Sequence, residues 1–351
     1  MFQNIDRVDD DLIRTVVQRS YMGTRDLTKN NFTLTYELNT FNNRLKTSVF
    51  GKYYNHKVAR MEPAARVISG QNVRVENFEE RIIDTSGYGI AASYLLNKSI
   101  VILGSAEKAV RLPSENELFG EAGENIVQNF SISPETSNNI NLGFKVGPYR
   151  AGRHQFSLGF NGFLRDTKDK IVRYPDTSNF NTATQALPYR NDPATKSLGF
   201  DADVQYSFSK NVLINYNISK FNTKFNKKGS GNYGLQLPNE PFFTMNAGLQ
   251  YIFYDWFGQN SRFNIFYNYR YVKAFNSALV SGNLAGYDYF IVPTQQVHDF
   301  GVSYQFPKKD FIISLDVKNA FDRLVYDNFA VQKPGRAFYL KLNYTINNTT
   351  K

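Results

Sequence analysis

The sequence predicts an all-β fold of antiparallel, up-and-down strands that form a transmembrane barrel. Apolar and polar side chains alternate along many segments, and these segments are about 9 to 13 residues long. Strand side chains have a period of two, so each segment has one apolar and one polar face. Soluble strands usually have about 5 to 6 residues, whereas a tilted strand needs about 9 to 11 to cross a bilayer. The length therefore favours a membrane.

The strand with the clearest alternation is Phe200–Phe208, where Phe200 and Val204 face one side and Asp201 and Asp203 face the other. About thirteen strands are predicted in this way, and Leu12–Met22 is a candidate for a fourteenth. In chain order the thirteen are Phe32–Leu38, Leu45–Tyr53, Tyr88–Leu96, Ser99–Val110, Ile140–Val146, Phe156–Leu164, Phe200–Phe208, Val212–Ile218, Met245–Phe253, Phe263–Tyr271, Phe300–Phe306, Phe311–Val317 and Phe338–Ile346.

The connections between these strands alternate between short and long. Short turns are expected near residues 42–43, 97–98, 147–152, 210–211, 258–261 and 307–309. Long loops are expected at 59–85, 111–135, 166–196, 225–241, 274–296 and 321–335. In a membrane barrel one rim carries tight turns and the other carries long loops, so this rhythm supports the barrel.

The composition agrees with this interpretation. The 351 residues include 30 Phe and 23 Tyr, which suit strands and membrane interfaces. No run of about 18 apolar residues occurs, so a transmembrane helix is excluded. The absence of Cys excludes disulfides and thiolate metal clusters. The polar start, MFQNIDRVDDD, is no signal peptide, so the protein either is not exported or lacks its front.

Charge and aromatic residues indicate where the strand faces point. The net charge is +10, but Lys and Arg are spread along the chain rather than clustered, which argues against nucleic-acid binding. Anionic lipopolysaccharide or an anionic ligand explains the positive net charge equally well.

Charged strand faces must look into the lumen, because a cation facing mid-bilayer lipid costs about 2 to 4 kcal/mol. Aromatic residues gather at strand ends, as in Tyr251, Phe253 and Trp256, which fits an interfacial girdle or ordinary sheet packing.

No catalytic, metal or cofactor site is expected, so the chain is not predicted to be an enzyme. His56, His154 and His298 lie far apart without ligand spacing. The GSGNYG of residues 229–234 matches a nucleotide-binding pattern only formally, because no helix follows it.

Two segments carry a resemblance to a known family. The stretch Glu107–Lys145, EKAVRLPSENELFGEAGENIVQNFSISPETSNNINLGFK, and the closing stretch Asn319–Ile346 resemble TonB-dependent outer-membrane receptors. The matching positions are Arg111, Pro113, Glu117, Leu118, Phe119, Pro134, Glu135, Ser137, Asn319, Phe321, Asp322, Pro334, Gly335 and Arg336. We interpret these residues as structural, shaping extracellular loops and strand starts, rather than as ligand-binding.

The resemblance implies a 22-stranded barrel in the bacterial outer membrane, preceded by a plug domain and a box that engages TonB. Neither is found in this chain, so residues 30–351 are expected to be the carboxyl-terminal barrel portion, and residues 1–29 a loop or partial strand. Such receptors take up bulky, scarce ligands, most often ferric siderophores, with energy from TonB. Lipid and lipopolysaccharide are the expected surroundings.

Polar and aromatic residues of the long loops are candidates for ligand contact. These are Tyr174, Tyr189, Arg190, Tyr233, Tyr287 and Tyr289. They alternatively cap the loops or contact lipopolysaccharide. Two other functions stay open: a passive porin, which needs no plug, and a soluble β-rich carbohydrate-binding or adhesive protein, which would enclose its apolar faces between two sheets.

Overall fold

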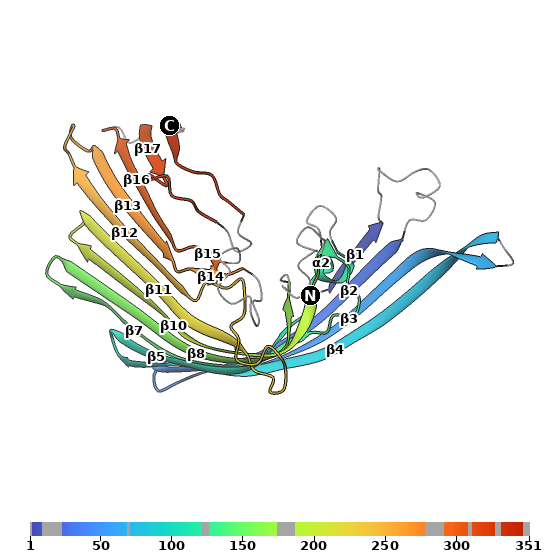
Figure 1. Cartoon of the computed structure of the whole chain (residues 1–351). Coiled ribbons are helices and arrows are strands. Elements are labelled where there is room, and N and C mark those ends of the chain that lie inside the picture. The colour runs from blue at the N-terminus through green and yellow to red at the C-terminus, as the bar shows by residue number, and fades with distance from the viewer. Residues whose placement is uncertain are drawn as a thin grey trace, which may run out of the picture.

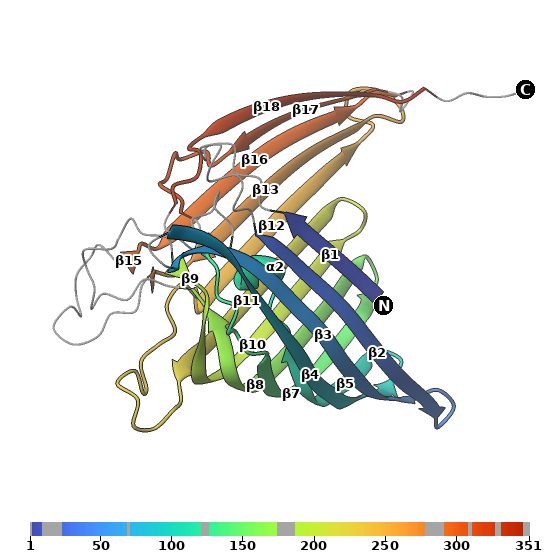
Figure 2. The ribbon, with the colours of Figure 1, turned by 90° about the vertical axis from the view of Figure 1, so that its right-hand side faces the viewer.

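The computed structural model describes residues 2–8, 23–68, 71–120, 126–173, 187–277, 291–307, 311–326 and 331–346. Fourteen strands form one sheet in which each strand pairs antiparallel with its neighbours in chain order, and β1 and β18 are its edges. The sheet curves strongly, so that its amino-terminal and carboxyl-terminal strands form opposite sides of the curve (Figures 1 and 2). The expected antiparallel up-and-down sheet is confirmed.

The strands of this sheet are β1 (Phe2–Val8), β2 (Thr24–Thr40), β3 (Leu45–Ile68), β4 (Gln71–Asn97), β5 (Ile100–Arg111), β7 (Glu135–Ala151), β8 (His154–Val172), β10 (Arg190–Phe208), β11 (Val212–Phe225), β12 (Phe243–Tyr254), β13 (Arg262–Val272), β16 (Gln295–Gln305), β17 (Phe311–Lys318) and β18 (Ala337–Tyr344). The remaining elements are the helix α2 (Glu115–Phe119) and the short strands β6 (Ile126–Val127), β9 (Leu187–Pro188), β14 (Phe275–Asn276) and β15 (Ile291–Val292).

Every segment predicted as a strand overlaps a strand, and many strands are longer than predicted, although Ser99, Phe306, Thr345 and Ile346 lie just outside theirs. The expected long loop at 59–85 is wrong, because β3 and β4 continue through it with 24 and 27 residues. Cross-strand ion pairs support this extension: Lys57 lies 3.0 Å from Glu80, and Arg60 lies 2.7 Å from Glu79. The fourteenth strand is β1, and the candidate Leu12–Met22 lies outside the described residues.

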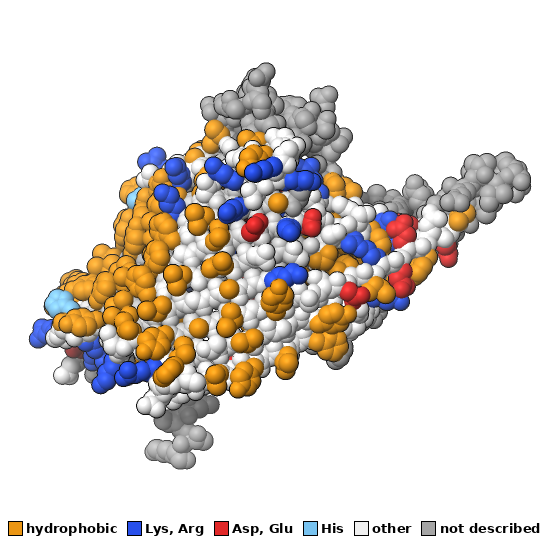
Figure 3. Space-filling model, turned by 90° about the horizontal axis from the view of Figure 1, so that it is seen from below, with side chains coloured by type: hydrophobic (Ala, Val, Ile, Leu, Met, Phe, Trp, Pro, Cys, Tyr) orange, Lys and Arg blue, Asp and Glu red, His pale blue; other side chains and the backbone are white. Residues whose placement is uncertain are grey.

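The register keeps the apolar faces of neighbouring strands on the same side of the sheet. One row of paired residues runs across seven strands: Ile102, Phe144, Phe160, Ala202, Ile218, Met245 and Tyr271. Within it the rings of Phe144 and Phe160 stack 5.5 Å apart. Apolar side chains cover much of the convex face (Figure 3), where Leu198 and Leu340 are 64% and 69% exposed. A single sheet with an exposed apolar face is the arrangement that lipid requires.

Aromatic side chains cluster where β12, β13 and β16 meet the short-turn rim. The ring centroids of Phe253 and Trp256 lie 4.7 Å apart, and Trp256 lies 5.2 Å from Phe263. Phe257 extends the cluster to Tyr304 at 5.6 Å. Trp256 and Phe257 are both more than half exposed, which fits an aromatic girdle at a membrane interface.

None of the helices in the described ranges is long and apolar enough to span a membrane.

The orientation of the faces is tested by placing the same cation on each side of β10. Val204 lies midway along the apolar face, while Gln205 faces the concave side. We expect Val204→Arg to lower the free energy of unfolding by about 2 to 4 kcal/mol, because the guanidinium would sit in hydrocarbon. Gln205→Arg should cost far less. Urea-dependent unfolding in phosphatidylcholine vesicles measures both, and equal losses would contradict the assignment.

Candidate functional site on the concave face

The connection between β5 and β7 folds over the concave side of the sheet in its described residues, 112–120 and 126–134. Its helix α2 lies inside the curve (Figure 1). Ser114 begins the helix with a capping box, in which the Ser114 amide donates to Glu117 Oε2 at 2.8 Å and the Glu117 amide donates to Ser114 Oγ at 3.4 Å. Gly120 ends the helix at φ 78°, where a Cβ would lie 2.6 Å from the Ile126 carbonyl oxygen. The local sequence therefore fixes both ends of α2.

Apolar packing holds this connection against the sheet. Leu118, Phe119 and Ile132 are buried in a cluster with side chains from β2, β3, β4 and β8. The sheet contributes Leu27, Val58, Ile83 and Ile171, with Leu112, Phe130 and Tyr189 packed around them. Because each of these side chains leaves water, the folded position of residues 112–120 and 126–134 is stabilised by the hydrophobic effect.

Arginines from three neighbouring strands contact the same connection, two through its carbonyl groups and one through an aromatic ring. Arg25 of β2 donates to the Phe119 carbonyl at 3.0 Å. Arg81 of β4 donates to the Ile132 carbonyl at 2.8 Å, and the Arg60 guanidinium of β3 lies 4.7 Å from the centre of the Phe130 ring. Carbonyl groups outside regular structure need donors when buried, and these arginines supply them.

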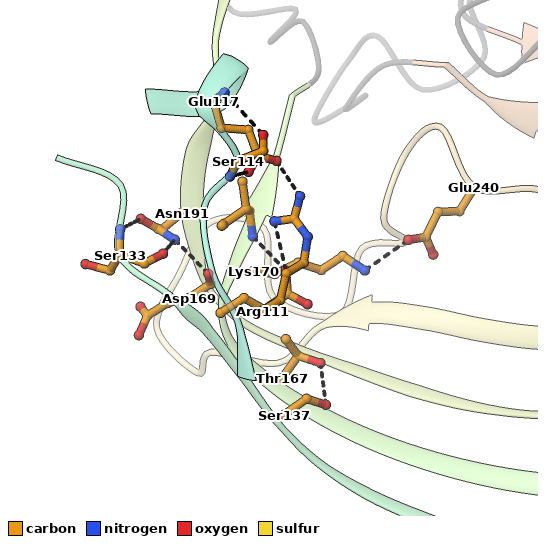
Figure 4. Close-up of polar contacts among 12 residues, drawn as sticks. Arg111, Ser114, Glu117, Ser133, Ser137, Thr167, Asp169, Lys170, Asn191 and Glu240 are labelled. Carbon is orange, nitrogen blue, oxygen red and sulfur yellow. Dashed lines mark hydrogen bonds and ion pairs between the residues drawn. The ribbon is translucent and has the colours of Figure 1, made fainter. Parts of the chain in front are cut away.

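Polar side chains join the connection to β7 and β8 (Figure 4). The guanidinium of Arg111 forms an ion pair with Glu117, which is only 3% exposed, and lies 3.9 Å from Glu135. Glu135 in turn accepts the Ile171 amide at 3.1 Å. Arg111 is thus placed between two carboxylates at the end of β5.

A second polar anchor is Asn191 on β10. Its side-chain amide donates to the carbonyls of Ser133 and Asp169 at 2.9 and 2.7 Å, and its Oδ1 accepts the Ser133 amide at 2.8 Å (Figure 4). One side chain therefore binds two segments that are far apart in the sequence.

Beside this network the concave wall contains a hollow of about 490 Å³. The charged residues that line it are Arg111, Glu135, Arg165, Lys170 and Glu240, and the hydroxyl and amide side chains are Ser137, Asn139, Thr167, Thr195, Ser197, Thr223 and Asn239. Lys170 pairs with Glu240 at 3.0 Å, and the Arg165 guanidinium lies 4.7 Å from the centre of the Phe163 ring. Such a wall offers hydrogen-bond donors, acceptors and both signs of charge to a polar ligand.

The candidate residues of the closing stretch lie elsewhere, between β17 and β18. Asn319 is buried and donates from its side chain to the Arg323 carbonyl at 2.8 Å. Asp322 accepts the Arg336 amide at 2.8 Å, and a Cβ on Gly335 would lie 2.5 Å from the Asp322 carboxylate. Phe321 and Pro334 are exposed in the same connection. These contacts shape a loop at one edge of the sheet, away from the hollow.

Of the expected ligand-loop residues, three are described, and Tyr233 lies apart from Tyr189 and Arg190. Tyr174, Tyr287 and Tyr289 lie outside the described residues. Tyr189 packs against the buried cluster, and its carbonyl accepts from Asn129 at 2.8 Å. Arg190 begins β10, while Tyr233 is exposed in the separate connection between β11 and β12.

Of the first motif, the structure places Arg111, Glu117 and Glu135 in one network, with Pro113 before α2 and Pro134 before β7. Sequence reasoning missed Arg25, Arg81, Arg165 and Lys170. The sequence signal for Arg165 was its place on the polar face of a strand, but only the register reveals its neighbours.

Comparison with protein-family models matches residues 84–320 to the model described as TonB dependent receptor-like, beta-barrel. No curated protein sequence is significantly similar to the chain.

Solved structures share the fold at low sequence identity. The closed form of the ferric-catecholate import receptor Fiu from K12 E. coli aligns with a TM-score of 0.67 and 13% identity, over 92% of this chain and 45% of its own. The siderophore receptor PiuA from Acinetobacter baumannii gives 0.67 and 15%, over 92% and 44%. The copper transporter OprC gives 0.64 and 17%, over 92% and 48%. The chain therefore spans about half the length of these proteins.

The capping box predicts how firmly residues 112–134 are held. We expect Ser114→Ala to destabilise the first turn of α2 by about 1 kcal/mol, because the Glu117 amide loses its acceptor. Hydrogen exchange at the Glu117 and Leu118 amides measures this local loss. Ser131→Ala, an exposed serine of the same connection, is the control and should leave exchange unchanged; equal protection in both variants would contradict the role of the cap.

Proposed function

Because the chain belongs to the TonB-dependent receptor-like β-barrel family, we propose that it forms wall strands of a receptor that transports a bulky, scarce ligand across the outer membrane. Barrels of this family lie in the bacterial outer membrane, and the chain lies there too. The ligand we propose is a ferric siderophore, and the energy would come from the TonB complex through a plug and box that this chain does not show.

The observation that carries this proposal is the hollow on the concave face. It lies beside an inward-folded connection rather than on the lipid-facing side, so a ligand bound there would be shielded from lipid. Its volume of about 490 Å³ is within the usual range for small-molecule sites, about 300 to 1,000 Å³. A siderophore presents many oxygen atoms around its iron, and the guanidinium, ammonium and hydroxyl groups of the wall are suitable partners for them.

The names of the similar structures support the ligand class. Fiu is a ferric-catecholate import receptor and PiuA a siderophore receptor, whereas OprC is a copper transporter. Because the identities are only 13% to 17%, these similarities establish the shared fold alone. The choice of ligand therefore rests mainly on the chemistry of the hollow.

The alternatives are less well supported. A soluble sandwich would enclose its apolar faces between two sheets, but the main sheet is a single layer that exposes Leu198 and Leu340. A passive porin would share the barrel, yet Leu118, Phe119 and Ile132 of the β5–β7 connection pack into the concave side, and this inward packing favours a binding site over an open channel.

Arg165 is the residue that best tests the role of the hollow. Its side chain is exposed within the concave wall, and Arg165→Gln removes the cation while keeping donors. We expect uptake of iron from a panel of catecholate and hydroxamate siderophores to need a ligand concentration roughly tenfold or more higher, because a charge-assisted hydrogen bond is lost.

Arg150→Gln is the matched control, since Arg150 is exposed on β7 next to the short turn and far from the hollow. Radioactive iron uptake in iron-limited cells measures both variants, with a strain lacking TonB as the energy control. Unchanged uptake by Arg165→Gln would show that the hollow does not bind the ligand. Uptake that persists without TonB would contradict the energised mechanism.

A further inference from the structure

The short turns of the sheet carry a row of cations along the rim opposite the long connections. Each of the five short turns that the structure describes in full has an Arg or Lys at its bend or directly after it. These residues are Arg44 between β2 and β3, Lys98 between β4 and β5, Arg153 between β7 and β8, Lys210 between β10 and β11, and Arg262 at the start of β13, here called the rim cations. All of them are exposed, and Figure 1 shows their turns along one rim of the curved sheet.

Hydrogen bonds between neighbouring hairpins hold these turns in place. The Arg153 carbonyl accepts the Ser209 amide of the next hairpin at 2.6 Å. The Lys210 carbonyl in turn accepts the Tyr254 hydroxyl of β12 at 3.2 Å. Because rim cations are joined to the next hairpin through their own backbone, their positions along the rim are fixed by the sheet.

Acidic side chains do not balance the rim cations within the described part of the chain. None of the rim cations takes part in the ion pairs found there. The acid in these turns is Asp255, whose carboxylate accepts the Asn260 amide of its own turn. Arg150, a further cation close to Arg153, donates to the Gln155 side chain at 3.0 Å and is not counted in the row. Positive charge is therefore left in excess at this rim.

The spacing of the row indicates what kind of anion can bind it. Neighbouring strands lie about 4.8 Å apart, so turns that are two strands apart repeat roughly every 10 Å, and the row extends over roughly 40 Å. The Debye length at physiological ionic strength is about 8 Å, so each cation attracts a separate anionic group. A small anion or a single lipid headgroup reaches only one or two turns. An extended polymer with repeated anionic groups reaches all of them and gains from multivalency.

The register shows that the row is not directed at lipid where it can be traced. Arg262 is opposite Tyr254, and its guanidinium lies 5.5 Å from the centre of the Tyr254 ring. Phe253, the residue before Tyr254, is on the same apolar face as Met245, so Tyr254 and Arg262 are on the opposite, concave face. In outer-membrane barrels the short turns face the periplasm. The rim cations therefore lie at the aqueous, periplasmic end of the wall.

We propose that the rim cations are a docking surface for peptidoglycan, the periplasmic polymer whose peptide stems carry carboxylates at repeated intervals. Carboxylates of successive stems pair with cations of successive turns, so the polymer lies along the periplasmic rim. The argument is charge complementarity, and the length and direction of the row favour a polymer in the periplasm over a lipid headgroup. This surface is separate from the concave hollow and does not depend on which ligand is transported.

The test uses the protein extracted from outer membranes in a neutral detergent, together with purified peptidoglycan sacculi. Co-sedimentation measures the apparent Kd. Relative to the parent protein, we expect Arg153→Gln combined with Lys210→Gln to weaken binding about fourfold, and glutamine at all of the rim cations to weaken it about thirtyfold, because each exposed ion pair is worth roughly twofold. Salt at about 1 M should release the parent protein, since the Debye length falls to about 3 Å.

The matched control removes the same number of charges at the long-connection end, and it should bind as the parent does. It combines Lys168→Gln, Lys196→Gln, Lys224→Gln, Lys227→Gln and Lys228→Gln, which are all exposed residues. Arg153→Lys combined with Lys210→Arg keeps both rim charges and should also bind. Heat-modifiable gel migration verifies folding, and the double glutamine variant gives the answer if the full variant does not fold. Parent-like binding by the glutamine variants overturns the proposal, as does an equal loss in the control set.

Two further arms identify the anion. Sacculi whose carboxyl groups have been amidated with a neutral amine should bind poorly, because the partners of the rim cations are gone. An excess of phosphatidylglycerol in mixed detergent micelles should fail to displace the protein from untreated sacculi. Undiminished binding to the amidated sacculi, or complete displacement by the anionic lipid, would show that the rim does not recognise the carboxylates of the wall.

Discussion

The structure depends on the register of its fourteen strands. In hydrocarbon no water can satisfy a backbone amide or carbonyl, so each strand must hydrogen-bond to its neighbours along its buried length. The pairing also sets which face each side chain occupies, because the period is two. A slip of one residue at β10 would turn Asp201 and Asp203 toward lipid and Phe200 and Val204 toward the concave side. One set of hydrogen bonds thus fixes both the fold and the chemistry of its two faces.

Because a lipid-facing surface must be mainly apolar, the concave face and the long connections are where polar side chains can gather. The described residues of the connection between β5 and β7 combine polar and apolar contacts with the concave face. The connection has little regular structure of its own, so its carbonyl groups are bound by Arg25 and Arg81 while Leu118 and Ile132 bury apolar surface against the sheet. Apolar contact fixes the segment to the sheet, and the arginine hydrogen bonds fix its orientation there. The hollow beside it is a consequence of this packing.

The sequence predicts the strands well because alternation is a local signal, readable within a single segment such as Phe200–Phe208. It predicts the ends of strands poorly. Residues 59–85 contain Pro63 and many charges, which are typical of a loop, yet cross-strand pairs such as Arg60 with Glu79 continue the hairpin. The contacts of the site are still harder to predict from the sequence, because Arg25 and the Phe119 carbonyl are 94 residues apart and no local pattern joins them. The capping box is the one part of the site that a short sequence pattern can indicate, because Ser114 and Glu117 are only three residues apart.

Many cations of the described residues are balanced by carboxylates of the same chain. On the concave side and at the sheet edge, cations stand beside carboxylates: Arg111 with Glu117, Lys170 with Glu240 and Lys341 with Asp316. Partly enclosed charges need such partners, because burial removes the water that would otherwise stabilise them.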